Sequence, residues 1–534
     1  MTSNQTSTIK GPRAVDAISR QVLGIDALLK LVEPRSEAAA ELWGDLGQMS
    51  FLPPDIRKEE LERLRRLDGA LDAPRAHALD EHLAGLPSLK RTFRRLEADE
   101  VLRDADFFEL KRFLFHGLSI LRIADGLDSL PSADSELGEL LQVIMETIHP
   151  EQRVSTRFHL ADELDSALHH SREQMRSVRK RYKVRRQMLE KSIISDHKGS
   201  FDIRGRFRPV DDEPIDDMRL QRDDGLYRIV DAEMEALADE LDAARQTVSE
   251  EETRQRQRLT AFVKQHAPTL NELKQLWLRF DLRLAKVELR RHLQGCWPKT
   301  REDDDGPPLS IRGGRDPLLS TSLGSDQVQP IDVELNQAGT VVLGPNMGGK
   351  SALLRLIGLI QWCAQMAFPV PADECAVLGV DRVVYIGSEE PGRSDVTEGL
   401  SSFGREVRRF VDYWDVHGRT LWLLDEPGRG THPEEGAQLA EEICRRRVSS
   451  GDRVVAATHF PQLADADGFA LLSIAGLAID DAELERRLAR ASDVGESLEA
   501  VLRRCMDYRV VEVDGGDVPR DARRVARALG LDLS

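Results

Sequence analysis

The sequence predicts a helical region over residues 1–300 followed by an α/β domain over residues 301–534. In the first part, apolar residues recur at three- and four-residue spacing, as at Leu61 and Leu64, which is typical of amphipathic helices. In the second part, short β-branched runs alternate with helical stretches, which indicates a doubly wound sheet with buried strands. Residues 297–330 bring the breakers and charges REDDDGPP and IRGGRDP, so we place the domain junction there.

Two long helices are expected in the first part, at Glu163–Lys191 and Leu226–Lys264. Residues 196–225 between them are rich in Gly, Pro, Asp and Arg, so we expect a loop or a short hairpin. For residues 466–534 we expect a helical stretch, one strand and a short helix. The strands expected in the second part are Thr340–Leu343, Arg382–Ile386, Thr420–Leu424, Arg453–Thr458 and Tyr508–Val513.

The bulk composition limits the classes of function. The chain has 534 residues, of which 31% are charged and 5% aromatic, with a formal net charge of −18. A strongly acidic chain is repelled by the phosphate backbone, so nucleic-acid binding would need a local basic patch. The five cysteines lack C-x-x-C spacing, which argues against a disulfide framework and a zinc site. The sequence begins without a signal-peptide pattern and has no membrane-spanning stretch, so we expect a cytoplasmic protein with no membrane partner.

A glycine-rich segment carries the strongest chemical signal. The sequence GPNMGGKS matches G-x-x-x-x-G-K-[ST], follows the apolar run that ends at Leu343, and opens an amphipathic helix at Lys350. Such a segment wraps backbone N–H groups around phosphates at a helix N-terminus. We expect Lys350 to reach the β- and γ-phosphates of ATP and Ser351 to ligate Mg²⁺. The expected nucleotide-binding residues are Gly344, Pro345, Asn346, Met347, Gly348, Gly349, Lys350, Ser351 and the following Ala352.

Two further strand ends carry polar residues. The run Thr420–Leu424 is followed by Asp425 and Glu426, where Asp425 is expected to hold Mg²⁺ and Glu426 to polarise the attacking water. Acidic residues after an apolar strand are common, and this pair gains weight because it lies downstream of the glycine-rich segment. The next strand ends in Thr458 and His459, and His459 is expected to contact the γ-phosphate or the attacking water. A lone histidine is more often structural, and the position after this strand favours the functional role.

These segments together resemble the ATPase domain of the MutS family, the mismatch-repair ATPases of the ABC-type group. The resemblance rests on four motifs in order: GPNMGGKS (344–351), GLSSFGRE (399–406), LDEPGRGTH (424–432) and ATHFPQLA (457–464). It is strong over about residues 310–465 and implies a P-loop NTPase fold. Pro427 and His432 depart from the family's usual residues in the turn after the carboxylates.

The resemblance also implies a homodimer with composite ATP sites. Ser401 is then the residue that would complete the ATP site of the other subunit. Its alternative role is an ordinary N-cap of the helix that follows, and both can hold because a helix N-terminus also suits phosphate.

The helical half fits the family in outline. Residues 162–264 would be the lever helices, and residues 196–225 would be a reduced form of the DNA-gripping clamp. From this resemblance we expect no counterpart of the family's N-terminal mismatch-reading and connector domains in residues 1–300. Phe107-Phe108-Glu109 has the wording of the family's base-wedge motif, but it lies in a helical apolar pattern and we interpret it as core.

A basic segment could bind DNA. Residues from Arg172 to Arg208 hold many arginines and lysines and few acids, which is what local phosphate binding needs. The alternatives are a solvated helix face or a surface that docks an acidic protein.

Two functions therefore stay open. One is a DNA repair or recombination ATPase that couples ATP binding and hydrolysis to mismatched, branched or damaged DNA. The other is an ATPase that remodels a protein client, since some short MutS-like proteins resemble factors that reactivate cobalamin-dependent aminomutases.

Overall fold

The computed structural model describes most of the chain. The described residues are 14–127, 130–149, 158, 160–162, 165–211, 214–224, 226–302, 307–324, 327–344, 349–387, 402–459, 468–494, 497–513 and 522–528. The chain forms two compact units, of which the first comprises Met1–Ala73, Leu127–Ser129 and Leu278–Ser534. The second comprises Pro74–Gly126 and Leu130–Trp277. No helix among the described residues combines the length and the apolar character needed to cross a membrane.

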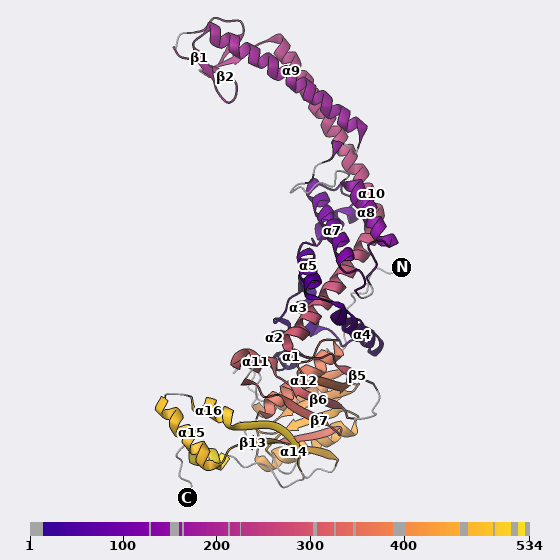
Figure 1. Ribbon diagram of the computed structural model, residues 1–534, viewed down its shortest axis with the longest axis vertical. Coiled ribbons are helices and arrows are strands. Elements are labelled where there is room, and N and C mark those ends of the chain that lie inside the picture. The colour runs from indigo at the N-terminus through magenta and orange to yellow at the C-terminus, as the bar shows by residue number, and fades with distance from the viewer. Residues whose placement is uncertain are drawn as a thin grey trace. The chain divides into compact units, whose positions relative to one another are not determined.

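A six-stranded sheet organises the first unit, in the order β10-β11-β12-β8-β13-β14 (Figure 1). The first five strands run parallel, and β14 runs antiparallel to β13 at one edge. Because the parallel strands are buried on both faces, their sequences are almost continuously apolar. The bounds are β8 (Gly339–Leu343), β10 (Arg382–Gly387), β11 (Thr420–Asp425), β12 (Arg453–Ala457), β13 (Phe469–Leu477) and β14 (Met506–Glu512).

A second sheet of this unit has the order β5-β9-β6-β7. Its strands are β5 (Lys299–Arg301), β6 (Leu309–Gly314), β7 (Ile331–Leu335) and β9 (Glu374–Leu378). The helices of the unit are α1 (Ala17–Val22), α2 (Ile25–Leu29), α3 (Glu37–Asp45), the 3-10 helix η1 (Leu46–Gln48), α4 (Pro54–Ala70), α11 (Pro317–Leu323), α12 (Lys350–Gln365), α13 (Ser402–Trp414), α14 (Pro433–Ser449), α15 (Asp481–Val494), α16 (Leu498–Cys505) and α17 (Ala522–Ala528).

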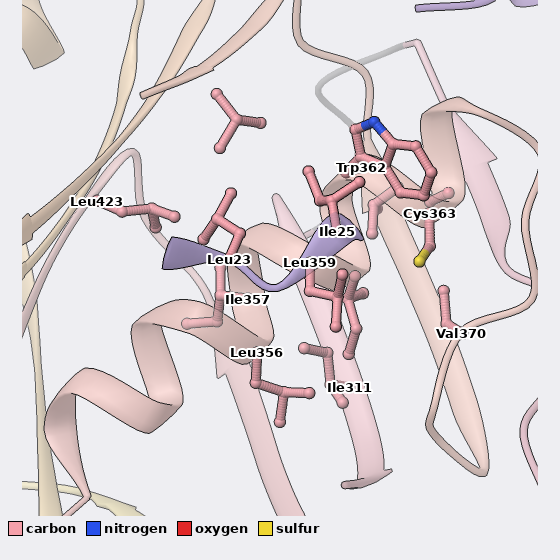
Figure 2. Close-up of a cluster of buried hydrophobic side chains, with 14 of the residues drawn as sticks. Leu23, Ile25, Ile311, Leu356, Ile357, Leu359, Trp362, Cys363, Val370 and Leu423 are labelled. Carbon is pink, nitrogen blue, oxygen red and sulfur yellow. The ribbon is translucent and has the colours of Figure 1, made fainter. Parts of the chain in front are cut away.

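Helix α12 lies in the middle of the main hydrophobic core (Figure 2). Its Ile357 and Trp362 are fully buried, and the core around them includes Leu23 before α2 and Leu423 of β11. At Gly358 a Cβ atom would lie 2.5 Å from Leu23 and 2.6 Å from Leu423, so only glycine lets these two elements pack so closely on α12. The helix that opens at the glycine-rich segment is therefore held rigidly.

The N-terminal segment packs on β10 of the six-stranded sheet. Val15 forms a parallel bridge with Val383 of β10, and the Ser19 hydroxyl accepts a hydrogen bond from the Tyr385 backbone N–H at 2.9 Å. Arg409 of α13 pairs with Asp16 at 3.0 Å. These contacts tie the start of the described chain to the C-terminal sheet, although the helical region was expected to span residues 1–300.

The second unit is mostly helical and carries a small sheet. Its helices are α5 (Ala73–Ala84), α6 (Lys90–Glu97), α7 (Asp104–Ile123), α8 (Glu136–Ile148), α9 (Ser166–Asp196) and α10 (Ala232–Leu293), which continues into the first unit from Leu278. The sheet has the order β1-β2-β4-β3, with β1 (Gly199–Phe201), β2 (Arg206–Pro209), β3 (Leu220–Asp223) and β4 (Leu226–Ile229). Phe107 is fully buried in α7 and stacks on Phe158 at 5.1 Å between ring centroids, so its interpretation as core is confirmed.

The expected elements are confirmed in outline, and three details were wrong. Residues 226–229 form strand β4, whereas a helix was expected from Leu226, and α10 runs without interruption to Leu293. The segment 196–225 was expected to be a loop or a short hairpin. It contains the antiparallel pair β1–β2 and also strand β3 of the same sheet. Strand β13 was missed, because a helical stretch was the only element expected in residues 466–534 before the strand Tyr508–Val513. The broad prediction of a helical chain with α/β sheets in its C-terminal part holds.

Candidate functional site

The glycine-rich segment connects β8 to α12. Gly344 follows β8 directly, and Gly349 is the N-cap of α12 with φ of 87°, a left-handed conformation that favours glycine. Residues 345–348, which include the expected Pro345, Asn346, Met347 and Gly348, lie outside the described residues. Ser351 and Ala352 lie in the first turn of α12, where backbone N–H groups have no intrahelical partner.

Lys350 is the first residue of α12 and is only 5% exposed. Its Nζ donates to the Gly344 carbonyl oxygen at 2.8 Å. Burial lowers the pKa of Lys350, and attraction to Glu426 and Asp425 partly offsets this effect. The Lys350 ammonium group therefore lies near both carboxylates, between the glycine-rich segment and the end of β11.

Asp425 is the last residue of β11 and is 5% exposed. Its Oδ2 accepts a hydrogen bond from the Tyr385 hydroxyl at 2.8 Å, and Tyr385 lies on the neighbouring parallel strand β10. Among the described residues, Oδ1 of Asp425 accepts no hydrogen bond. One carboxylate oxygen is thus fixed by the fold, and the other remains available.

Glu426 has an unusual backbone conformation. Its φ is +55°, which places a residue with a Cβ atom in the left-handed region, and its N–H donates to the Ala457 carbonyl at 2.8 Å. The carboxylate pairs with Arg429 at 2.9 Å and lies 3.8 Å from Nδ1 of His459. The structure therefore brings Glu426 close to His459, the residue expected to contact the γ-phosphate or the attacking water. Non-glycine residues in this region cluster at functional sites.

The turn after Glu426 is attached to α13. The Glu406 carboxylate of α13 accepts the Gly428 N–H at 2.8 Å, and burial raises the pKa of Glu406. Gly428 has φ of 79°, and a Cβ atom on it would lie 2.6 Å from the Gly436 carbonyl oxygen of α14. The expected Ser401 directly precedes α13 and lies outside the described residues.

Pro427 and His432, which differ from the family's usual residues, both lie near the turn that follows Glu426. Pro427 is buried in the turn. His432 is exposed and is the N-cap residue of α14, whose first helical residue is Pro433. Proline is favoured at this helix position because its missing N–H has no acceptor there anyway.

The residues present fit a magnesium nucleotide. An ammonium group, free helix N-terminal N–H groups and a serine hydroxyl lie at the start of α12, and these groups suit phosphates. The Asp425 oxygen without a hydrogen-bond partner is the hard oxygen ligand that Mg²⁺ prefers, directly or through water. Sequence reasoning missed Tyr385 because its role depends on strand pairing: in β10 and β11, Gly387 lies opposite Asp425.

The basic segment lies in the second unit, on α9 and strands β1 and β2 (Figure 1). Several of its arginines pair with carboxylates of the same unit, such as Arg172 with Glu252 at 2.8 Å and Arg185 with Asp231 at 2.7 Å. The other pairs are Arg176–Asp162, Arg181–Glu240, Arg186–Glu190 and Arg206–Asp202. Among the described residues, no side-chain partner is found for Arg179, Lys180, Lys183, Lys191, Lys198, Arg204 and Arg208.

Comparisons with known proteins identify relatives of this chain. Residues 340–496 match the family model of MutS domain V. An endonuclease MutS2 of Geobacillus sp. (strain WCH70) is 35% identical over 210 residues, which cover 38% of this chain and 25% of the relative. An endonuclease MutS2 of Halalkalibacterium halodurans is 39% identical over 160 residues, covering 29% of this chain and 19% of the relative. A DNA mismatch repair protein MutS of Thermotoga neapolitana is 26% identical over 411 residues, covering 76% and 49%. The chain thus matches half or less of the length of these relatives.

Proposed function

Because this chain belongs to the MutS family, we propose that it is an ATPase that couples ATP binding and hydrolysis to DNA binding in repair or recombination. The observation that carries the ATPase proposal is the meeting of Lys350 at the start of α12 with Asp425 and Glu426 at the end of β11. A buried ammonium group beside two carboxylates suits a triphosphate and its magnesium ion better than it suits a structural role.

Each residue has a role set by its position. Lys350 and the first-turn N–H groups of α12 bind the phosphates, and Ser351 and Asp425 would hold Mg²⁺. Mg²⁺ supplies positive charge that offsets charge on the phosphate oxygens. Glu426 orients and polarises the attacking water, and His459 lies beside it to contact that water or the γ-phosphate.

The ion pair between Glu426 and Arg429 bears on this role. Arg429 is largely exposed, so the pair is weak and can open when a nucleotide arrives. Glu426 then exchanges the guanidinium for the attacking water. The partly buried Glu406 keeps the turn in place during this exchange by accepting the Gly428 N–H.

We further propose a homodimer in which Ser401 of one subunit completes the ATP site of the other. The support is the family resemblance of the segment 399–406 and the position of Ser401 next to α13. A dimer held by shared ATP would open after hydrolysis, which would transmit the state of the site to the rest of the chain.

DNA binding is proposed for the basic segment. The support is the set of seven cationic side chains that pair with no carboxylate among the described residues and are therefore available to phosphates. Contacts of this kind bind phosphates without reading sequence, and their strength falls with salt.

A second candidate function is an ATPase that acts on a protein client, such as a cobalamin-dependent aminomutase. Val184, Met188 and Ile194 of α9 are 42%, 62% and 49% exposed. They share a helix face with the unpaired Lys180 and Lys191, because these residues follow one another at spacings of three and four. Apolar side chains among lysines suit a protein surface better than they suit a phosphate backbone.

Phosphate release tests the ATPase proposal. The wild type should hydrolyse ATP with Mg²⁺, and Lys350→Ala should abolish turnover by removing the phosphate-binding ammonium group. Lys58→Ala, on the exposed side of α4, is the matched control and should turn over as the wild type does. Equal turnover in Lys350→Ala and the wild type would remove the carrying observation.

Fluorescence anisotropy separates the two functions. Duplex and branched DNA should bind at low salt, and Lys180→Gln with Lys183→Gln and Lys191→Gln should weaken binding and lower its salt dependence. Arg186→Gln is the control, because Arg186 is already paired with Glu190. Two results together would support the second function. DNA would not bind, with or without an ATP analogue, and the double variant Val184→Ser/Met188→Ser would no longer reactivate an aminomutase.

A further inference from the structure

A pocket lies at the end of the six-stranded sheet where β10 and β11 begin. Its volume is about 450 Å³, and all of its lining residues belong to the first unit. Asp381 and Arg419, which directly precede β10 and β11, both line it. Asp425 lies at the other end of β11, so the pocket is separate from the candidate triphosphate site.

Hydrogen bonds to the end of α12 hold the walls of the pocket in place. Residues 51–54 (FLPP) form one apolar side and lead into α4. The Leu52 N–H donates to the carbonyl oxygen of Gln365, the last residue of α12, at 3.2 Å. Oε1 of Gln365 accepts the Val380 N–H at 2.6 Å, which attaches the same helix end to the segment before β10. A preformed cavity of this size, with apolar walls and a few polar groups, is typical of a small-molecule site.

Arg57 of α4 supplies a buried positive charge. It is only 2% exposed, and its guanidinium group pairs with the carboxylate of Glu302. The Glu302 side chain is 51% exposed, so water screens this pair and a carboxylate of a ligand can join it. The planar guanidinium group matches a carboxylate in shape and charge. The pocket therefore offers a binding point for the carboxylate of a small molecule.

Asp381 supplies an exposed negative charge that the fold holds in place. Its Oδ2 accepts the Arg419 N–H at 2.7 Å, and a Cβ atom on Gly418 would lie 2.7 Å from the same oxygen. Only glycine therefore lets the carboxylate approach so closely, and Gly418 also has φ of 107°. Oδ1 of Asp381 accepts no hydrogen bond from the residues that the structure describes. This oxygen is available to an ammonium group.

We propose that this pocket binds a free α-amino acid, with its carboxylate on Arg57 and its ammonium group on Asp381. The charged groups that line the pocket are two cations and two carboxylates, namely Arg57, Arg419, Glu302 and Asp381. A simple anion would be repelled by the carboxylates and a simple cation by the arginines, whereas a zwitterion presents each end to a group of opposite sign. Residues 51–54 would then contact an apolar side chain of the ligand. The inference does not depend on the proposed ATPase function.

Calorimetry on the full chain without nucleotide tests the proposal. The proteinogenic L-amino acids are the probes, and at least one with an apolar side chain should bind at one site per chain. Two derivatives of that amino acid are then titrated: the N-acetylated form lacks the ammonium group, and the amide lacks the carboxylate. Each should bind about tenfold more weakly or worse, because each loses one charge-assisted contact.

Asp381→Asn tests the position of the ligand. The variant keeps an oxygen that can accept the Arg419 N–H but loses the charge, so the dissociation constant of the free amino acid should rise about tenfold. Asp415→Asn is the matched control, because Asp415 is an exposed carboxylate in the same loop as Arg419 that does not line the pocket. This variant should bind the amino acid as the wild type does. Arg57→Gln should also weaken binding, and Asp381→Asn decides the matter if the loss of the buried arginine unfolds the chain.

Three results would overturn the inference. A wild type that binds none of the amino acids at millimolar concentration would show that the pocket is not a site for them. Equal binding of the free amino acid and either derivative would show that the pocket does not recognise a zwitterion. Unchanged binding in Asp381→Asn would place the amino acid elsewhere on the chain. A failure to bind ATP would leave all of these results unaffected, so it would refute the ATPase proposal alone.

Discussion

The hydroxyl group of Tyr385 donates a hydrogen bond to Oδ2 of Asp425 at 2.8 Å, across the pairing of β10 with β11. Both side chains are buried, and this bond determines which way the carboxylate points. In a site that holds a metal ion, such a partner orients the ligand and is nearly as important as the ligand itself.

Tyr385→Phe should therefore raise the Mg²⁺ concentration that supports half-maximal ATP hydrolysis, by about tenfold. The Asp425 carboxylate loses its orienting donor while the ring volume stays the same. Tyr227→Phe, which removes a hydroxyl hydrogen bond to the Ile215 N–H in the other unit, is the control and should leave the Mg²⁺ requirement unchanged. An identical Mg²⁺ titration for Tyr385→Phe and the wild type would contradict this role.

Glu426 combines strain with function. At φ of +55° a residue with a Cβ atom strains the backbone and destabilises the folded state. The free energy of unfolding should therefore be higher for Glu426→Gly than for Glu426→Gln, by roughly 0.5–1 kcal/mol. Both variants should lose hydrolysis by a factor of about 10²–10⁴, because neither can polarise water. Urea unfolding and phosphate release check the two parts. Equal stability of the two variants would mean that the backbone is not strained.

The close approach of Gly428 and Gly436 predicts that Gly436, which lies outside the motifs, does not tolerate substitution. A Cβ atom on Gly436 would lie 2.4 Å from the Gly428 carbonyl oxygen, so Gly436→Ala must displace the turn that follows Glu426. The expected cost is about 1–3 kcal/mol in the free energy of unfolding, with a fall in kcat. Gly69→Ala in α4, where a Cβ atom meets nothing within 4 Å, should instead raise stability slightly. A Gly436→Ala variant as stable as the Gly69→Ala control would refute the steric argument.

Mild acid should destabilise the second unit through a histidine pair. Nδ1 of His82 and Nδ1 of His116 are 3.1 Å apart, and burial, with repulsion from His82 and Arg112, lowers the pKa of His116 to about 4. The unfolded chain, where His116 has its ordinary pKa, binds more protons between that value and about 4. The free energy of unfolding therefore falls as the pH drops through this window.

Thermal unfolding at about pH 7 and about pH 5 measures this effect. His116→Gln should lose less stability on acidification than the wild type does. His77→Gln, which changes an exposed histidine on α5, should behave as the wild type. The same acid sensitivity in His116→Gln and the wild type would assign the effect to other groups.

Local patterns predicted the elements that carry the chemistry. The strand before the glycine-rich segment, the helix from Lys350 and the strand that ends at Asp425 are where periodicity and turn residues placed them. These elements are short-range features, because burial and the flanking turn residues specify them. β13 was missed because FALLSIAGL has a single β-branched residue and its alanines and leucines also suit a helix.

Contacts between segments far apart in the chain could not be predicted from the sequence. Pro268 lies inside α10 without ending it, although a proline removes one helical hydrogen bond, because packing along both sides of the proline stabilises the helix. Tyr508 was expected in a strand, but its position against Gly349 depends on β14 pairing with β13 and β13 with β8. The order of strands in a sheet is a tertiary property, and the local patterns of one sequence do not predict it.

Equilibrium dialysis with labelled ATP and Mg²⁺ on the Glu426→Gln variant tests the central claim most directly. That variant keeps Lys350 and Asp425 but should not hydrolyse the nucleotide, so it should retain about one ATP per chain. Adding Lys350→Ala to it should abolish retention. A Glu426→Gln protein that retains no labelled ATP at saturating Mg²⁺ would contradict the claim that the start of α12 and the end of β11 form a triphosphate site.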